Sequence, residues 1–282
     1  MAWISTPFGR FNDAPGPDPL EGLLADADRA AARQRRRGPP LPQGPTRGAS
    51  IFGAGRLGSW SGLLLGQAAV PVRIADRDVL ESRNLQSGNC PYRASDIGLP
   101  KVVAFHNLLR QQAPGILVEA VQADLLLLSE EEFVSLTEGA GVALGLVDDG
   151  PVLFRINRLL YRRLPVVYAA GHQGARTGDI LITRPGTACL ECILNINSPD
   201  QIRTLAGEST HGIDVVAIAK TCAKIALALL GDTRLGDARE VLSPGANFLF
   251  IENRLSPGNP GNLALQSLRI ERRPTCPVCG AL

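Results

Sequence analysis

A glycine-rich turn between apolar stretches determines which folds this chain can adopt. Ile51 and Phe52 precede the sequence GAGRLG at residues 53–58, and a largely apolar stretch, residues 59–70, follows it. This order predicts a strand, a tight turn and a helix. Glycines in such a turn let backbone N–H groups approach a phosphate, and the N-terminus of the helix adds unpaired N–H donors and a positive dipole end.

An acidic residue closes the next predicted strand. Residues 72–75 read as that strand, and Asp76 follows them. A carboxylate at this place commonly meets the hydroxyls of a ribose. A turn with a purely structural purpose is the alternative, since the glycine pattern alone is weak. The nucleotide contacts that we predict from the turn and the acidic residue are Gly53, Gly55, Arg56, Gly58 and Asp76.

The rest of the chain alternates between strand-like and helix-like stretches. Beyond residue 76, strands are predicted at 116–121, 142–147 and 165–170, with helices at 100–112, 129–138 and 153–163. This alternation predicts an α/β fold with a doubly wound, mostly parallel, Rossmann-like sheet. Later strands at 178–184, 247–252 and 263–271, and a helix at 212–230, predict a mixed C-terminal extension of that sheet.

The first 48 residues read as a separate extension. Prolines punctuate them, and one helix is predicted at 20–37, ending in a basic run. That run is either a solvated helix end, with cations at the negative end of the dipole, or a contact with a partner subunit. Residues 49–282 are predicted to form one domain.

Charge and hydropathy limit the partners. The 282 residues carry a formal net charge of +2, too balanced to indicate nucleic acid binding. No apolar run reaches the length of a membrane span, and residues 1–18 lack the pattern of a secretory signal. We therefore expect a cytoplasmic protein that binds neither nucleic acid nor membrane.

Four of the six cysteines form two CxxC pairs, Cys189 with Cys192 and Cys276 with Cys279. Two thiolates at this spacing can reach one ion, and two pairs complete a closed, tetrahedral zinc site. The alternative is four unrelated thiols or a redox dithiol. With no open coordination position, the zinc would be structural and would stabilise the C-terminal part of the chain.

Two further segments identify a family. The sequences DRDVLESRNLQ at residues 76–86 and DIGLPK at residues 96–101, with the glycine turn and the CxxC pairs, resemble the ThiF/MoeB family, bacterial relatives of ubiquitin-activating enzymes. The resemblance covers about residues 48–282. It implies a homodimeric, ATP-dependent adenylyltransferase that activates the C-terminal glycine of a small ubiquitin-like or sulfur-carrier protein. A conjugating enzyme or a sulfur donor would be the next partner.

Adenylation needs a held phosphate, a stabilised pyrophosphate and a magnesium ion ligated by carboxylates. Lys101 begins a predicted helix, where its ammonium can face the phosphates. Asp148 and Asp149 end a predicted strand, at the edge where open α/β sheets bind ligands, and we favour Asp148 as the magnesium ligand. The resemblance adds Asn84, beside the phosphates, and Asp78 to the site.

The chain departs from the family directly after Asn84 and Leu85. Relatives usually have an arginine there that contacts phosphate, and this chain has Gln-Ser-Gly at residues 86–88. The candidates for a substitute cation are Arg56, Arg83, Arg93 and the arginines within residues 29–37 of a neighbouring subunit. Two other hypotheses remain: a non-catalytic subunit of a heterodimeric activating enzyme, and a nicotinamide-dependent oxidoreductase with structural zinc.

Two cysteines lie outside the pairs. Cys222 is in an apolar helical stretch and is expected to be a buried thiol. Cys90 is in a loop near the predicted nucleotide edge. It is either an ordinary thiol or a reactive one that accepts the activated acyl group.

Overall fold

The computed structural model describes residues 3–6, 9–12, 47–196, 211–242, 245–253 and 264–280. The chain divides into two compact units, Met1–Gln43 and Gly44–Leu282. In the first unit, β1 (Trp3–Thr6) and β2 (Gly9–Asn12) form an antiparallel pair. The helix predicted at residues 20–37, with its arginine run, lies outside the described residues.

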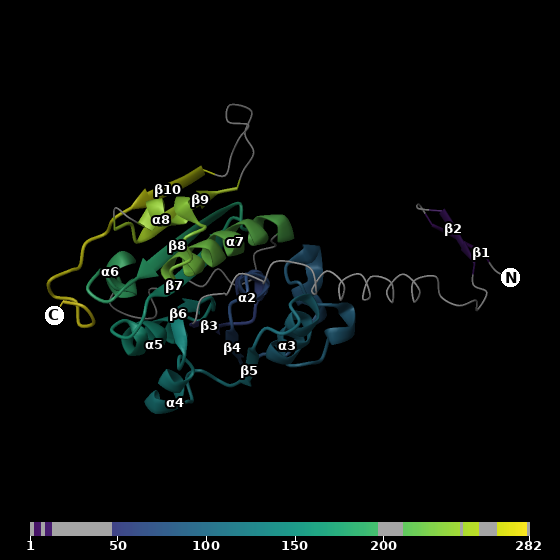
Figure 1. Cartoon of the computed structure of the whole chain (residues 1–282), viewed down its shortest axis with the longest axis horizontal. Helices are drawn as coiled ribbons and strands as arrows, with labels where there is room; N and C mark the ends of the chain where they lie inside the picture. Colours follow the sequence, from purple (N-terminus) through teal and green to yellow (C-terminus); the bar gives the residue numbers. More distant parts are fainter. Residues whose placement is uncertain are drawn as a thin grey trace. The chain divides into compact units, whose positions relative to one another are not determined.

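The described part of the second unit contains an eight-stranded sheet with the order β10-β9-β8-β7-β6-β3-β4-β5 (Figure 1). Strands β5, β4, β3, β6 and β7 are parallel, whereas β7, β8, β9 and β10 pair antiparallel. This confirms the predicted doubly wound sheet with a mixed extension. The strands are β3 (Gly48–Phe52), β4 (Val72–Asp76), β5 (Val118–Gln122), β6 (Ala140–Gly145), β7 (Val166–His172), β8 (Thr177–Thr183), β9 (Phe248–Glu252) and β10 (Ala264–Leu268).

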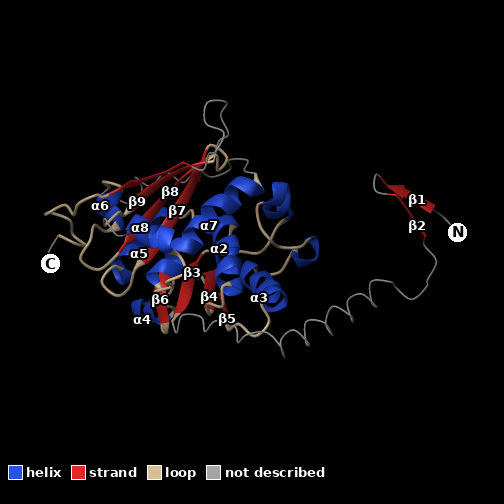
Figure 2. Ribbon diagram, turned by 45° about the horizontal axis from the view of Figure 1, so that its top comes forward, coloured by secondary structure: helices blue, strands red, loops and turns tan. Residues whose placement is uncertain are grey.

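Helices cover both faces of the sheet (Figure 2). Side chains that alternate along the strands divide into two buried clusters: Ile51 packs with α2, α3 and α7, whereas Phe52 packs with α4, α5 and α6. Short 3-10 helices, η1 (Ser82–Gly88) and η2 (Ala94–Asp96), follow β4. The α-helices are α2 (Arg56–Gln67), α3 (Lys101–Gln112), α4 (Glu130–Ser135), α5 (Gly150–Leu160), α6 (Leu190–Ile193), α7 (Gly212–Leu229) and α8 (Gly236–Leu242).

Several elements begin or end away from their predicted limits. Helix α5 starts at Gly150 and not at residue 153, because the side chain of Asp149 accepts a hydrogen bond from the N–H of Val152 and caps the first turn. Pro151 fits in that turn, where its missing N–H is not needed. The predicted strand at 142–147 is β6, which ends at Gly145. The two aspartates therefore lie in the loop between β6 and α5.

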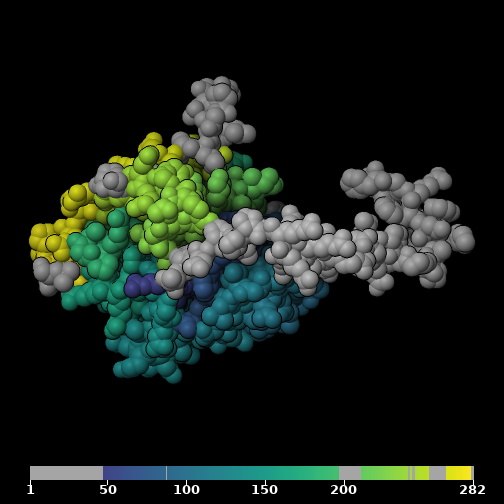
Figure 3. Space-filling model, viewed as in Figure 1, coloured from purple at the N-terminus to yellow at the C-terminus, as the bar shows by residue number. Residues whose placement is uncertain are grey.

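Figure 3 shows one face of the molecule, on which the green and yellow residues of the C-terminal part lie above the blue and teal residues that precede them in the chain. Among the residues that the structure describes, no helix combines the length and the apolarity that crossing a lipid bilayer requires.

Candidate functional site

The glycine turn joins β3 to α2 at the carboxyl edge of the sheet. Gly53 has a φ of +102°, and a Cβ atom there would lie 2.5 Å from the carbonyl oxygen of Leu146. A Cβ atom on Gly58 would lie 1.8 Å from the carbonyl oxygen of Gly53. Neither position can accept a side chain without a backbone shift. Gly55 differs, because no atom lies within 4 Å of a Cβ built there, so a ligand could approach its backbone closely.

Asp76 ties the turn to the end of β4. Its Oδ2 accepts a hydrogen bond from the N–H of Ala54 (2.6 Å), and its Oδ1 accepts one from the N–H of Asp78 (2.8 Å). Burial raises the pKa of Asp76 despite these two bonds, which act in the opposite direction. A carboxylate offers about four acceptor positions, so acceptor positions remain for ribose hydroxyls.

Two residues that the sequence suggested for the site form an ion pair. The Nζ atom of Lys101 lies 2.6 Å from Oδ2 of Asp78, and the side chain of Lys101 is only 11% exposed. The same two residues are also joined by a backbone hydrogen bond, in which the N–H of Lys101 donates to the carbonyl of Asp78 (2.9 Å). An ammonium group has three donors. Asp78 takes one of them, so this cation can still meet a phosphate.

The two adjacent aspartates have different surroundings. Asp149 accepts the N–H of Val152 at Oδ1 (3.2 Å), and its Oδ2 lies 3.8 Å from Nη2 of Arg77. Asp148 is exposed, and its side chain has no hydrogen bond or ion pair with another described residue. Of the two carboxylates, Asp148 is therefore the one that could ligate a magnesium ion without losing an existing partner.

Arg56 is the first residue of α2, and other sequence candidates lie in the loop after β4. Asn84 Oδ1 accepts the N–H of Glu81 (2.8 Å) and so caps η1, while Arg83 pairs with the carboxylate of Glu81 over 2.7 Å. The Cys90 thiol is buried, and its pKa is raised by that burial. This environment disfavours the thiolate that an acyl acceptor requires.

Tyr92 was not singled out by the sequence analysis. Its buried hydroxyl donates a hydrogen bond to the carbonyl of Ala54 (2.7 Å), inside the glycine turn. Tyr92 lies between the two segments that resemble the family, at residues 76–86 and 96–101. That position in the sequence does not predict a hydrogen bond to the glycine turn.

The four paired cysteines come together, as the sequence predicted. All four are buried, and their sulfur atoms lie within 4.8 Å of one another. Sγ of Cys189 lies 3.5 Å from that of Cys276, and Sγ of Cys192 lies 3.4 Å from that of Cys279. A zinc ion with Zn–S bonds of about 2.3 Å separates its sulfur ligands by about 3.8 Å, so this four-cysteine cluster is compatible with zinc.

Helix α5 connects this cluster to the site edge. Asn157, on α5, accepts the N–H of Leu190 at Oδ1 (3.0 Å) and donates to Glu191 Oε1 (3.3 Å). Arg158 pairs with the same carboxylate oxygen over 3.0 Å. Neither Asn157 nor Glu191 was identified from the sequence, because the contacts join distant segments.

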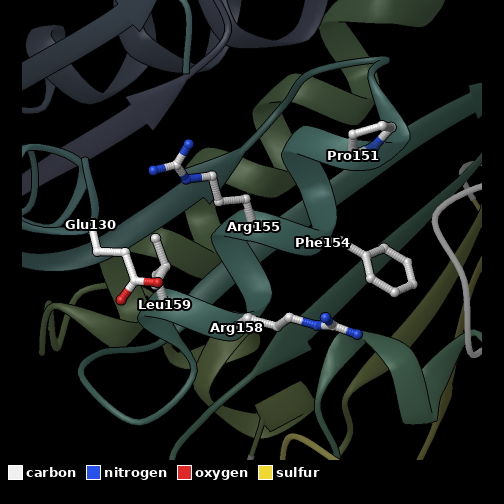
Figure 4. Close-up of a pocket in the computed structure, with 6 residues that line it drawn as sticks. All are labelled: Glu130, Pro151, Phe154, Arg155, Arg158 and Leu159. Atoms are coloured by element: carbon white, nitrogen blue, oxygen red, sulfur yellow. The ribbon is translucent and has the colours of Figure 1, made fainter. Parts of the chain in front are cut away.

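A surface hollow of about 320 Å³ lies along α5 (Figure 4). Its two arginines are already engaged: Arg155 donates to the carbonyls of Leu126 and Leu128, and Arg158 pairs with Glu191. No residue that we predicted for the nucleotide site lines it. The lining residues are Glu130, Pro151, Phe154, Arg155, Arg158 and Leu159.

Solved structures with this fold include the enzyme MccB. Escherichia coli MccB with ATP is 19% identical, covers 84% of this chain and 68% of its own, and superposes with a TM-score of 0.64. The microcin C7 biosynthetic enzyme MccB in complex with N-formylated MccA is 18% identical, covers 94% and 77%, and has a TM-score of 0.67. No curated protein matches the sequence. The ThiF family model matches residues 48–278, and the chain therefore belongs to the ThiF family.

Proposed function

We propose that this protein is an ATP-dependent adenylyltransferase that activates the C-terminal carboxylate of a small protein or peptide. The arrangement at the carboxyl edge of the sheet supports the proposal most directly. The glycine turn, the carboxylate of Asp76, the buried ammonium of Lys101 and the exposed carboxylate of Asp148 follow three neighbouring parallel strands. Open α/β sheets commonly bind nucleotides at the carboxyl ends of their parallel strands.

In the proposed reaction, a carboxylate oxygen of the acceptor attacks the α-phosphorus of ATP. A new O–P bond forms, the bond to the β-phosphate oxygen breaks, and pyrophosphate leaves with the electron pair. The products are an acyl-adenylate and pyrophosphate, and no oxidant or reductant is needed. Charge develops on the leaving group, so preorganised cations should contribute most of the catalysis.

Each site residue has a role in this proposal. The open backbone at Gly55 and the N-terminus of α2 would hold a phosphate, and Asp76 would accept ribose hydroxyls. Lys101 would contact the leaving phosphates. Asp148 would hold a magnesium ion, which neutralises phosphate charge when bound. Several aspartates lie at or just beyond the ends of the parallel strands β4, β5 and β6 (Asp76, Asp78, Asp124, Asp148 and Asp149), which fits a nucleotide that arrives as its magnesium complex.

The acceptor we favour is a small ubiquitin-like or sulfur-carrier protein that ends in glycine, as the family resemblance implies. A short peptide is the second candidate, because the solved MccB structures include complexes with MccA. The absent arginine after Asn84 and Leu85 supports a further version, in which the chain needs a second subunit for activity. The proposal includes a homodimer and the structural zinc ion.

ATP–pyrophosphate exchange with each acceptor class tests the proposal. We expect exchange that requires both magnesium and an acceptor with a free C-terminus. Lys101→Ala and Asp148→Ala should suppress the exchange, and Asp76→Ala should weaken ATP binding. A chain that binds NAD(H) but not ATP would overturn the proposal in favour of an oxidoreductase. Exchange that appears only after a second activating-enzyme subunit is added would identify a partner subunit.

A further inference from the structure

Arg77 connects three loops at the carboxyl edge of the sheet. Its Nη1 donates to Oδ2 of Asp124 over 2.9 Å, its Nη2 lies 3.8 Å from Oδ2 of Asp149, and its Nε lies 3.9 Å from Oδ1 of Asp78. These carboxylates follow β5, β6 and β4, respectively. In the sheet, β3 lies between β6 and β4 (Figure 1). The contact with Asp149 therefore joins the loops on either side of β3, at the end where the glycine turn begins.

These contacts favour a positioning role for Arg77 over a direct contact with phosphate. The side chain is 52% exposed, but three carboxylates surround its guanidinium. Their negative charges offset most of its attraction for an anion. An arginine whose forked donors meet carboxylates on separate loops instead fixes the relative position of those loops.

The contact between Arg77 and Asp149 bears on the loop between β6 and α5, which contains both adjacent aspartates. Oδ1 of Asp149 is used to cap α5, and Oδ2 faces Arg77. Asp148, one residue earlier, has no such partners among the described residues. The two carboxylates are adjacent in sequence, and a divalent cation could choose either of them if both were unpaired.

We propose that Arg77 is a positioning residue that keeps Asp149 as the cap of α5 and thereby leaves Asp148 as the metal-binding carboxylate. This inference rests on the proposed function, because it concerns the same metal–nucleotide site. It explains why two adjacent aspartates at this edge would not compete for one ion.

A double-mutant comparison tests this assignment, with binding rather than activity as the readout. Manganese suits the same oxygen ligands as magnesium, so electron paramagnetic resonance can follow the binding of Mn²⁺ with the ATP analogue AMPCPP to the full-length chain. We expect Asp148→Asn to weaken metal binding by about tenfold or more. With Arg77→Gln also present, Asp149 becomes available, and the loss caused by Asp148→Asn should shrink to about threefold or less.

Two further variants control the comparison, and a third is held in reserve. Asp124→Asn removes the closest partner of Arg77 but leaves its charge near Asp149, so it should not rescue Asp148→Asn. Arg163→Gln, a change at an exposed arginine after α5, should also fail to rescue it. Arg77→Met is a second neutral replacement that retains the aliphatic stem, for use if Arg77→Gln does not fold.

The outcomes separate this inference from the proposed function. Binding in the unmodified chain with equal losses from Asp148→Asn in both backgrounds would overturn the role of Arg77 alone. Equal rescue by Asp124→Asn would also overturn it, since a general loosening of the loops would then be the cause. An unmodified chain that binds no metal–nucleotide complex would overturn the proposed function itself.

Discussion

Two glycines of the same turn should differ in how much stability an added methyl group costs. Gly58→Ala places a Cβ atom 1.8 Å from the carbonyl oxygen of Gly53, so we expect a loss of about 1–3 kcal/mol or more in the free energy of unfolding. Gly55→Ala meets open space and a φ of −76°, so its stability should change by less than about 0.5 kcal/mol.

The same pair of variants separates structure from binding. ATP affinity should fall in Gly55→Ala although its stability is retained, because the methyl group occupies the space where a phosphate would approach the turn. Urea unfolding and isothermal titration with ATP measure the two effects. Unchanged ATP affinity in Gly55→Ala would contradict the placement of a phosphate at this turn.

The raised pKa of Asp76 predicts how nucleotide binding depends on pH. The ionised carboxylate accepts hydrogen bonds, and protonation removes acceptor capacity. Because burial raises the pKa of Asp76, ATP binding should weaken as the pH falls through a range above that of an exposed aspartate. ATP titrations over this range, compared between the unmodified chain and Asp76→Asn, measure the effect. A pH dependence that is identical in both proteins would contradict the assignment.

The position in the fold of a predicted site residue could be foreseen from the sequence where a motif fixes its place along the chain. The glycine turn, Asp76 and Lys101 follow from spacing, because each lies at the start or end of a recognisable element. Arg77 did not, although it lies between two predicted site residues. Its proposed positioning role rests on Asp124 and Asp149, which the strand order brings close to it, and no local sequence pattern specifies that order.

Among the elements, the predicted strands and helices of the described part were found, and their ends were less well predicted. Helix α5 illustrates the reason. The sequence Asp-Asp-Gly-Pro at residues 148–151 reads as the end of a strand, yet the same residues supply a cap and a proline-tolerant first turn. A capping side chain acts through one hydrogen bond, so hydrophobic periodicity does not reveal it.

The contact between α5 and α6 gives a prediction at this scale. Asn157 is fully buried and serves both the N–H of Leu190 and the carboxylate of Glu191. Asn157→Ala leaves both groups short of a partner and should lower the free energy of unfolding by about 1–3 kcal/mol. Urea denaturation measures the change. Arg163→Ala, at an exposed position after the same helix, is the matched control, and an equal loss there would contradict the argument.

At the scale of the whole second unit, α5 lies between two regions of different character. It begins at the aspartate loop beside the predicted nucleotide edge, and its later residue Asn157 contacts Leu190, which lies between the cysteines of the first pair. The parallel strands carry the predicted nucleotide residues, whereas the antiparallel strands and the cysteine cluster complete the core around α5 and α6. The cluster should therefore affect stability first and nucleotide binding only through α5.

Metal removal tests this division. Cys276→Ser replaces one of four buried cysteines whose sulfur atoms lie within 4.8 Å of one another. We expect bound zinc to fall from about one ion per chain, and the free energy of unfolding to fall by more than about 4 kcal/mol, since loss of a structural metal is among the most costly single changes.

Elemental analysis and hydrogen exchange follow the two effects. Amide hydrogen exchange should increase first in α6 and in residues 271–280, which the cysteine cluster joins, and later in β3 and β4. Cys222→Ala is the matched control, because that buried thiol lies in α7, outside the cluster, and its loss should leave the zinc content unchanged. A metal-free chain with undiminished stability would show that the four thiols hold no structural ion. Loss of zinc from Cys222→Ala as well would show that metal content reports general unfolding and not this site.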